Sequence, residues 1–228
     1  MCDAGRVSEV DTYLTGLGAA LRGPRRVKVD LLTEARDSLT DATAAYRELG
    51  FTEPAAAARA VAEFGTLDRT VPGYQAELAV AQSRGTALLI ALALPLLYLL
   101  TPLIWWHSPF SGPPADPVYG RLVVGFDALT GTGSVAATLV WFGFRWAGSL
   151  VLTRYVGPGA LVFLAVHGLN GGAVYLWRLA QVPGALHWPP LWAGVVVMWL
   201  AFSYAALCAW RCIATSRGAS RGIRRVGD

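Results

Sequence analysis

The chain has 228 residues, of which 54% are hydrophobic, and its formal net charge is +4. Residues 1–84 carry a net charge of −2 from ten basic and twelve acidic side chains, whereas residues 85–228 carry +6 from nine Arg and three Asp. An apolar second part whose few charges are mostly Arg is typical of a membrane protein and argues against an ordinary soluble enzyme. The positive excess therefore indicates membrane topology and does not predict a nucleic-acid surface.

Four short amphipathic helices are predicted in residues 1–84. The clearest covers 24–49, where apolar side chains recur every three or four residues along one face. Helices at about 8–21 and 52–65 flank it, and a fourth begins after Gly65 and runs toward the apolar part of the chain. Because each helix has one apolar stripe to bury, the four are predicted to share one core and form a small helical domain.

One face of the helix at 24–49 is acidic and lies away from its apolar stripe. It carries five carboxylates at helical spacing: Asp30, Glu34, Asp37, Asp41 and Glu48. Like charges at this spacing destabilise a helix, so the run does not serve helix stability. It is interpreted either as a solvated face or as a docking stripe for a basic protein partner. Direct binding to nucleic acid is not expected, since phosphate contacts need positive charge.

The motif "LRGPRRVKVDLLTEARDSLTD", followed by "GFTEPAAA" and "EFG", is the most specific pattern in the chain. With these motifs, residues 11–70 closely resemble the permease prefix domain, also called the HAAS signalling domain, of actinobacterial membrane proteins. The resemblance implies a cytosolic helical module ahead of transmembrane helices, often encoded beside a PadR-like winged-helix repressor. Related prefixes precede transporter permeases. The family implies no catalytic residue.

Four apolar runs follow, each long enough to cross the hydrocarbon core of a bilayer. They lie at about 86–106, 122–144, 158–177 and 191–211. The chain is thus predicted to be all-α, with a cytosolic domain at 1–84, a four-helix transmembrane bundle at 85–211 and a basic cytosolic tail at 212–228. Eight Arg flank one set of span ends and two flank the other, so the positive-inside rule predicts a multi-pass plasma-membrane protein with both termini in the cytoplasm.

Few polar residues interrupt the spans. Asp127 and Arg178 lie at similar predicted depth, so Asp127 is interpreted as the partner of Arg178 or, alternatively, as a ligand or proton site. His167, with Asn170 one turn further on, is interpreted as an interhelical hydrogen-bonding residue or as a relay. Gly168 and Gly172 form a close-packing motif that serves either the bundle itself or a homo-oligomer.

The motifs of common enzymes are missing from the sequence. There is no phosphate-binding loop, no nucleophile elbow and no His, Cys, Asp and Glu set at metal-ligand spacing. We therefore expect no catalytic residue, no metal and no cofactor. The residues predict a membrane anchor with a cytosolic domain, and the resemblance to the permease prefix domain implies a non-enzymatic signalling or adaptor protein of the lipid bilayer whose cytosolic domain engages a protein partner. Alternatives are a membrane subunit of a transporter, with Asp127, His167 and Asn170 lining a path, and a structural membrane protein.

Overall fold

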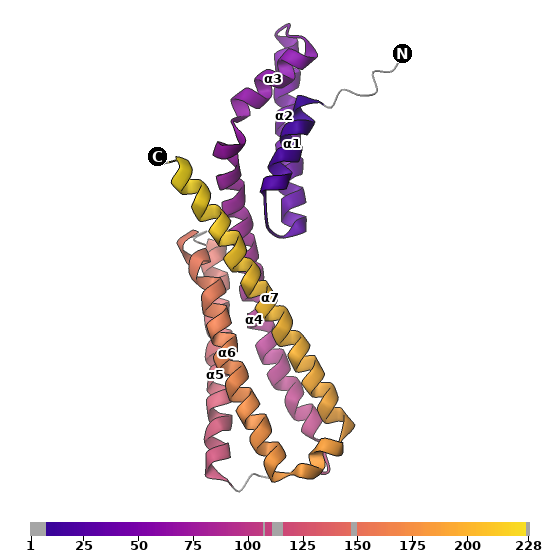
Figure 1. Cartoon of the computed structure of the whole chain (residues 1–228), viewed down its shortest axis with the longest axis vertical. Helices are drawn as coiled ribbons and strands as arrows, with labels where there is room; N and C mark the ends of the chain where they lie inside the picture. The colour runs from indigo at the N-terminus through magenta and orange to yellow at the C-terminus, as the bar shows by residue number, and fades with distance from the viewer. Residues whose placement is uncertain (1–7, 107, 111–115, 147–149, 227–228) are drawn as a thin grey trace. The chain divides into compact units, whose positions relative to one another are not determined.

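The computed structural model describes residues 8–106, 108–110, 116–146 and 150–226 (Figure 1). Within these ranges the chain folds as seven α-helices and one 3-10 helix, and no strand is present, which confirms the all-α prediction. The helices divide between two compact units. The first unit comprises Met1–Gln82 together with Ala214–Asp228, and the second comprises Ser83–Ile213.

The first unit contains the helices predicted ahead of the apolar runs. They are α1 (Glu9–Ala20), α2 (Arg25–Glu48), α3 (Glu53–Phe64) and the beginning of α4 (Leu67–Trp106). Gly50 follows the C-terminal end of α2 with φ +94°, and Gly65 ends α3 with φ +105°. Residues that carry a Cβ rarely adopt such a positive φ, so glycine suits both turns.

One hydrophobic core joins these four helices. Leu17 of α1, Leu39 of α2 and Leu78 of α4 are fully enclosed, and Ala57 and Ala60 of α3 complete the cluster. Burying a leucine side chain contributes roughly 1.5–3 kcal/mol before the entropic cost of ordering it. The prediction that four amphipathic helices share one core therefore matches the observed packing.

A buried glutamine ties the first unit together. Gln75 of α4 is 3% exposed, and its Oε1 accepts a hydrogen bond of 2.9 Å from the backbone N–H of Arg22. Its Nε2 donates to the carbonyl oxygens of Arg22 at 2.7 Å and of Thr215 at 3.3 Å. Thr215 belongs to α7 (Pro189–Val226), so the described part of the segment predicted as a cytosolic tail at 212–228 continues this helix, and Ala214–Asp228 groups with the first unit.

The second unit contains the predicted membrane spans. Four helices among the described residues are long and apolar enough to cross a membrane: α4, α5 (Pro117–Trp146), α6 (Leu150–Gln181) and α7. Each contains one of the four predicted runs. A 3-10 helix, η1 (Pro183–His187), connects α6 to α7. Large apolar side chains such as Leu169 and Trp146 are 77% and 85% exposed, as expected for surfaces that face lipid.

Glycines allow the helices of the second unit to approach closely. A Cβ on Gly133 of α5 would overlap the ring of Phe163 on α6, and a Cβ on Gly157 would lie 2.9 Å from the carbonyl oxygen of Ala209. Within the predicted close-packing motif, a Cβ on Gly168 would lie 3.5 Å from Phe202, whereas one on Gly172 would meet open space. Gly168 therefore packs inside this bundle, as small residues do at membrane helix interfaces.

Candidate functional site

The acidic stripe on α2 is an exposed surface. Its members, all exposed, are Asp30, Glu34, Asp37, Asp41 and Glu48. None of the five takes part in a hydrogen bond or an ion pair with another described residue. The sequence predicted this face correctly because 3.6-residue periodicity fixes which side chains share one side of a helix.

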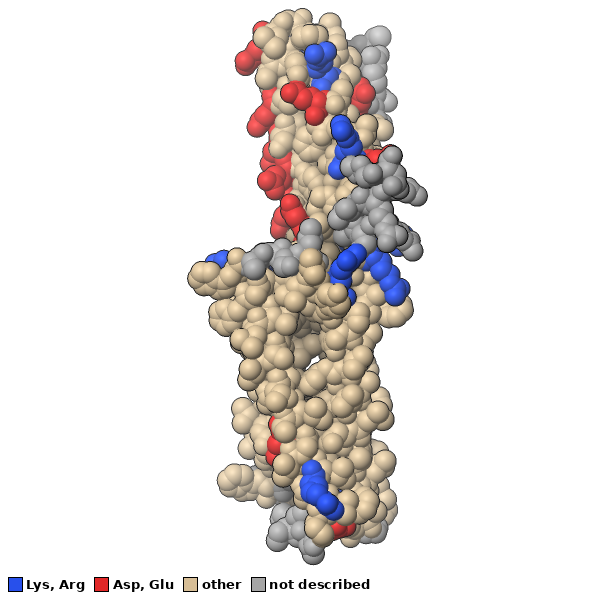
Figure 2. Space-filling model, turned by 90° about the vertical axis from the view of Figure 1, so that its left-hand side faces the viewer, with Lys and Arg blue, Asp and Glu red and all other residues tan. Residues whose placement is uncertain are grey.

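Three cations on the same helix as the stripe interact with groups outside it. Arg36 Nη1 lies 2.8 Å from Oδ1 of Asp11 on α1, and Arg47 Nη1 lies 3.5 Å from Oε2 of Glu53 on α3. Lys28 Nζ donates to the carbonyl oxygen of Leu21 at the C-terminal end of α1, where a positive charge is favourable. The stripe thus keeps its negative charge, and Figure 2 shows acidic side chains gathered along one side of this unit.

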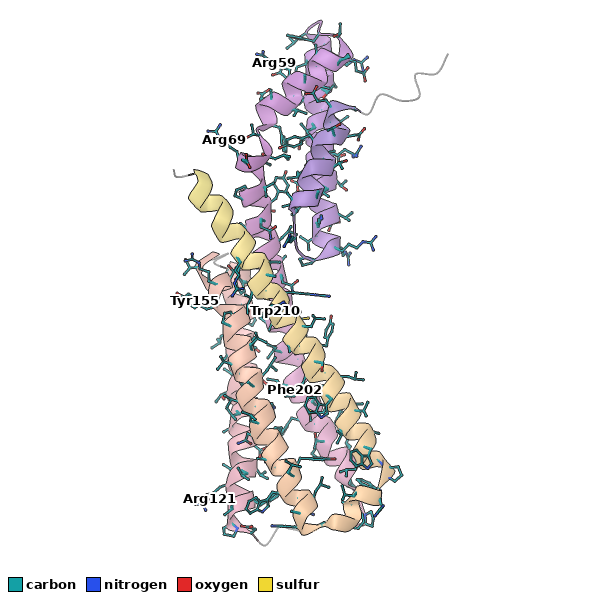
Figure 3. All side chains as sticks on the ribbon, in the orientation of Figure 1. Arg59, Arg69, Arg121, Tyr155, Phe202 and Trp210 are labelled. Atoms are coloured by element: carbon teal, nitrogen blue, oxygen red, sulfur yellow. The ribbon has the colours of Figure 1, made fainter. Side chains whose placement is uncertain are left out.

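A second cluster surrounds His167 in α6. Only 3% of His167 is exposed, and three phenylalanine rings stack on its imidazole. The ring centroids of Phe126, Phe163 and Phe202 lie 4.5, 5.6 and 5.6 Å from that of His167, with interplanar angles of 28°, 18° and 7°. Phe126 belongs to α5 and Phe163 to α6. Phe202, which is labelled in Figure 3, belongs to α7. We call these three residues the aromatic cage.

Three enclosed polar atoms on α6 have no hydrogen-bond partner among the described residues. They are Nδ1 of His167, Oδ1 of Asn170 and the hydroxyl oxygen of Tyr175. Leaving a buried donor or acceptor unsatisfied costs about 1–3 kcal/mol. Such groups inside a membrane bundle are expensive, and they mark the place where a ligand or a solvent molecule would be stabilised most.

A small cavity of about 10 Å³ lies beside the cage. It is lined by residues from all four helices, among them Tyr98 and Thr101 of α4, Thr130 of α5, His167 of α6 and Phe202 of α7. The hydroxyl of Thr101 donates to the carbonyl of Leu97, and the hydroxyl of Thr130 donates to that of Phe126, each at 2.8 Å. Both oxygens retain lone pairs, so the cavity offers acceptors and the imidazole in an otherwise apolar wall.

The ion pair expected between Asp127 and Arg178 does not form in the part of the chain that the structure describes. Arg178 Nη2 donates to the carbonyl oxygen of Phe110 at 2.8 Å, and Asp127 is partly exposed and forms no hydrogen bond or ion pair with another described residue. The reason is depth. Helix α5 begins at Pro117, so Asp127 lies about 15 Å along it, whereas Arg178 lies within about 5 Å of the end of α6.

Of the three polar residues that were expected to line a path, the structure places two close together and the third apart from them. His167 and Asn170 lie one turn apart on α6, and a Cβ on Gly125 of α5 would lie 3.4 Å from Nδ2 of Asn170. Asp127 does not line the cavity beside His167. The aromatic cage was not predicted from the sequence, because its rings come from three helices whose mutual register no local pattern encodes. The one available signal was the glycines that face these rings, such as Gly133.

No family model, curated protein or solved structure matches this chain. The likeness of residues 11–70 to the permease prefix domain therefore rests on the sequence motifs alone.

Proposed function

We propose that this chain is a non-enzymatic, membrane-anchored signalling or adaptor protein whose first unit engages a basic protein partner. The observation that carries this proposal is the acidic stripe, whose five carboxylates are exposed and without ion-pair partners among the described residues. The four apolar helices provide the anchor in the lipid bilayer. The resemblance of residues 11–70 to the permease prefix domain supports a winged-helix transcriptional regulator as the partner.

Electrostatics explains why such a partner fits. A regulator that binds DNA carries a basic surface, and an acidic helix face attracts the same surface that phosphates do. The attraction speeds encounter and confers specificity more than affinity. Its range is set by a screening length of roughly 8 Å at physiological ionic strength, so binding should weaken as salt is raised. The partner would then be divided between the membrane and DNA.

The orientation that this function requires places the first unit in the cytoplasm and both termini inside the plasma membrane. The test uses single cysteines at exposed positions in a chain without its native cysteines. We expect His187→Cys, in η1, to react with an impermeant maleimide added to intact cells, and Ser38→Cys, in α2, to react only after lysis. External labelling of Ser38→Cys together with protection of His187→Cys would show the opposite topology, with the first unit outside the cytoplasm.

Charge reversal on the stripe is expected to abolish partner binding. In the variant, Glu34, Asp37 and Asp41 are replaced by lysine, and the fold should persist because all three positions are exposed. The full chain in lipid nanodiscs serves as bait for cytosol of the source organism, and captured proteins are quantified by mass spectrometry. We expect a basic winged-helix protein on the wild-type bait, and its loss of at least about tenfold on the variant, as for an electrostatically steered contact.

A matched control separates the stripe from net charge. The substitutions Glu9→Lys, Asp68→Lys and Glu77→Lys change the charge equally at exposed positions off the stripe. This control should retain the partner, and thermal melting should verify that both variants are folded. If both triple variants bind alike, or if the stripe variant binds as wild type in low and high salt, the stripe is a solvated face and the proposal fails.

A further inference from the structure

We propose that the cavity beside His167 is a water-binding site in the second unit, lined by residues from all four of its long helices. The site goes beyond the proposed function, because it lies in the membrane bundle and needs no cytosolic partner. Two independent observations meet there: a cavity, and an enclosed imidazole nitrogen without a partner among the described residues. The enclosed amide oxygen of Asn170 lies one turn further along α6 and does not line the cavity.

The size of the cavity selects the ligand. A volume of about 10 Å³ is close to the smallest space that holds one water molecule. Phe126, which lines the cavity, is held against a glycine backbone, because a Cβ on Gly171 would lie 2.9 Å from its Cε2. This ring therefore has little room to retreat, and the volume of the cavity fits an occupant the size of water.

The polar groups select a hydrogen-bond donor. The hydroxyl protons of Thr101 and Thr130 are used on the carbonyls of their own helices, so both oxygens present lone pairs to the cavity. A molecule that donates two protons to these oxygens and also accepts one, from the imidazole N–H, satisfies all three groups. Water is the simplest molecule with this capacity.

The charge of the site favours a neutral occupant. Among the described residues that line the cavity there is no carboxylate, so a cation bound there would lack a counter-charge. Unpaired charges are disfavoured in a low-dielectric interior. Neutral water relieves the unsatisfied polar atoms without that penalty, and a bridging water is nearly as favourable as a direct hydrogen bond.

Asn170 is the only asparagine in the chain and His167 is one of three histidines, which makes a direct test practicable. The full chain is labelled with ¹⁵N at Asn and His and with ¹³C at Cys, and reconstituted in lipid bilayers. Water-edited solid-state NMR then measures how fast magnetisation from water reaches each side chain. Exposed His187 is the wet reference, and fully enclosed Cys212 is the dry reference. We expect magnetisation at His167 to build up at a rate within about twofold of that at His187, because a bound water lies in contact with its side chain. Build-up at His167 as slow as at Cys212 overturns the proposal.

Isosteric variants test which groups hold the water. Thr101→Val with Thr130→Val keeps the shape of the cavity and removes both acceptors, so the transfer rate at His167 should fall at least about threefold. Thr132→Val is the matched control, because its hydroxyl bonds to the carbonyl of Ala128 at 2.7 Å on the exposed side of α5. The control should leave the rate unchanged. A double variant with a native-like spectrum and an unchanged rate at His167 would refute the assignment of these hydroxyls and with it the site.

Discussion

Gly133→Ala is expected to destabilise the second unit by about 3 kcal/mol, the upper end of what overpacking a well-packed core costs. The added Cβ would overlap the ring of Phe163, which stacks on His167 at a centroid distance of 5.6 Å. The ring therefore cannot shift without disturbing the cage, and α5 and α6 must separate instead. The measurement is the thermal unfolding of the full chain in detergent, followed by tryptophan fluorescence, with the yield of folded protein as a second readout.

Gly131 provides the matched control on the same helix. A Cβ there meets no atom of the described residues within 4 Å, so Gly131→Ala should be neutral or should stabilise by up to about 1 kcal/mol through better helix propensity. Reducing the opposing ring, in Gly133→Ala with Phe163→Leu, should recover part of the loss. Equal melting of the two single variants would show that α5 and α6 do not meet at Gly133.

Gln75→Leu is expected to cost the first unit about 3 kcal/mol. The substitution removes the hydrogen bonds to the N–H and carbonyl of Arg22 and to the carbonyl of Thr215, in a position that is 3% exposed. Each backbone group left enclosed without a partner costs about 1–3 kcal/mol, and water partly replaces the lost bonds where it can enter. Hydrogen exchange of amides in α1 and α2 of the full chain should accelerate accordingly.

Two further variants define the cause of this loss. Glu77→Leu, two residues along α4 and exposed, should leave the exchange rates of α1 and α2 unchanged. Gln75→Glu keeps the acceptor for the N–H of Arg22 but loses both donated bonds, so its effect should resemble that of Gln75→Leu. If the amides of α1 and α2 exchange as slowly in Gln75→Leu as in wild type, the three hydrogen bonds contribute nothing to the stability of the first unit.

Local patterns were sufficient for the helices and for the acidic stripe. The helix predicted at 24–49 is observed at Arg25–Glu48, and each predicted membrane run lies within one observed helix. These features depend on periodicity, glycine turns and apolar length, all of which lie within a short stretch of chain. The five carboxylates of the stripe share a face for the same reason.

Local sequence patterns did not predict the contacts between helices. The depth of Asp127 was misjudged because the apolar run begins at 122, whereas the helix begins at Pro117. The role of Gln75 was missed because its partners Arg22 and Thr215 are 53 and 140 residues away in sequence. The cage around His167 likewise depends on how three helices are rotated about their axes. A single sequence contains no periodicity that reports such rotations.

The discontinuity of the first unit has a consequence for biosynthesis. Its closing element, Ala214–Asp228, follows the four apolar runs along the chain and is therefore synthesised after them. Until then the carbonyl of Thr215 is not available to Gln75. The first unit therefore reaches its complete form only after the four apolar runs have been synthesised, and chains terminated earlier would display an incomplete one. Nascent chains halted before residue 214 should accordingly be more sensitive to protease in α1 and α2 than the full-length product.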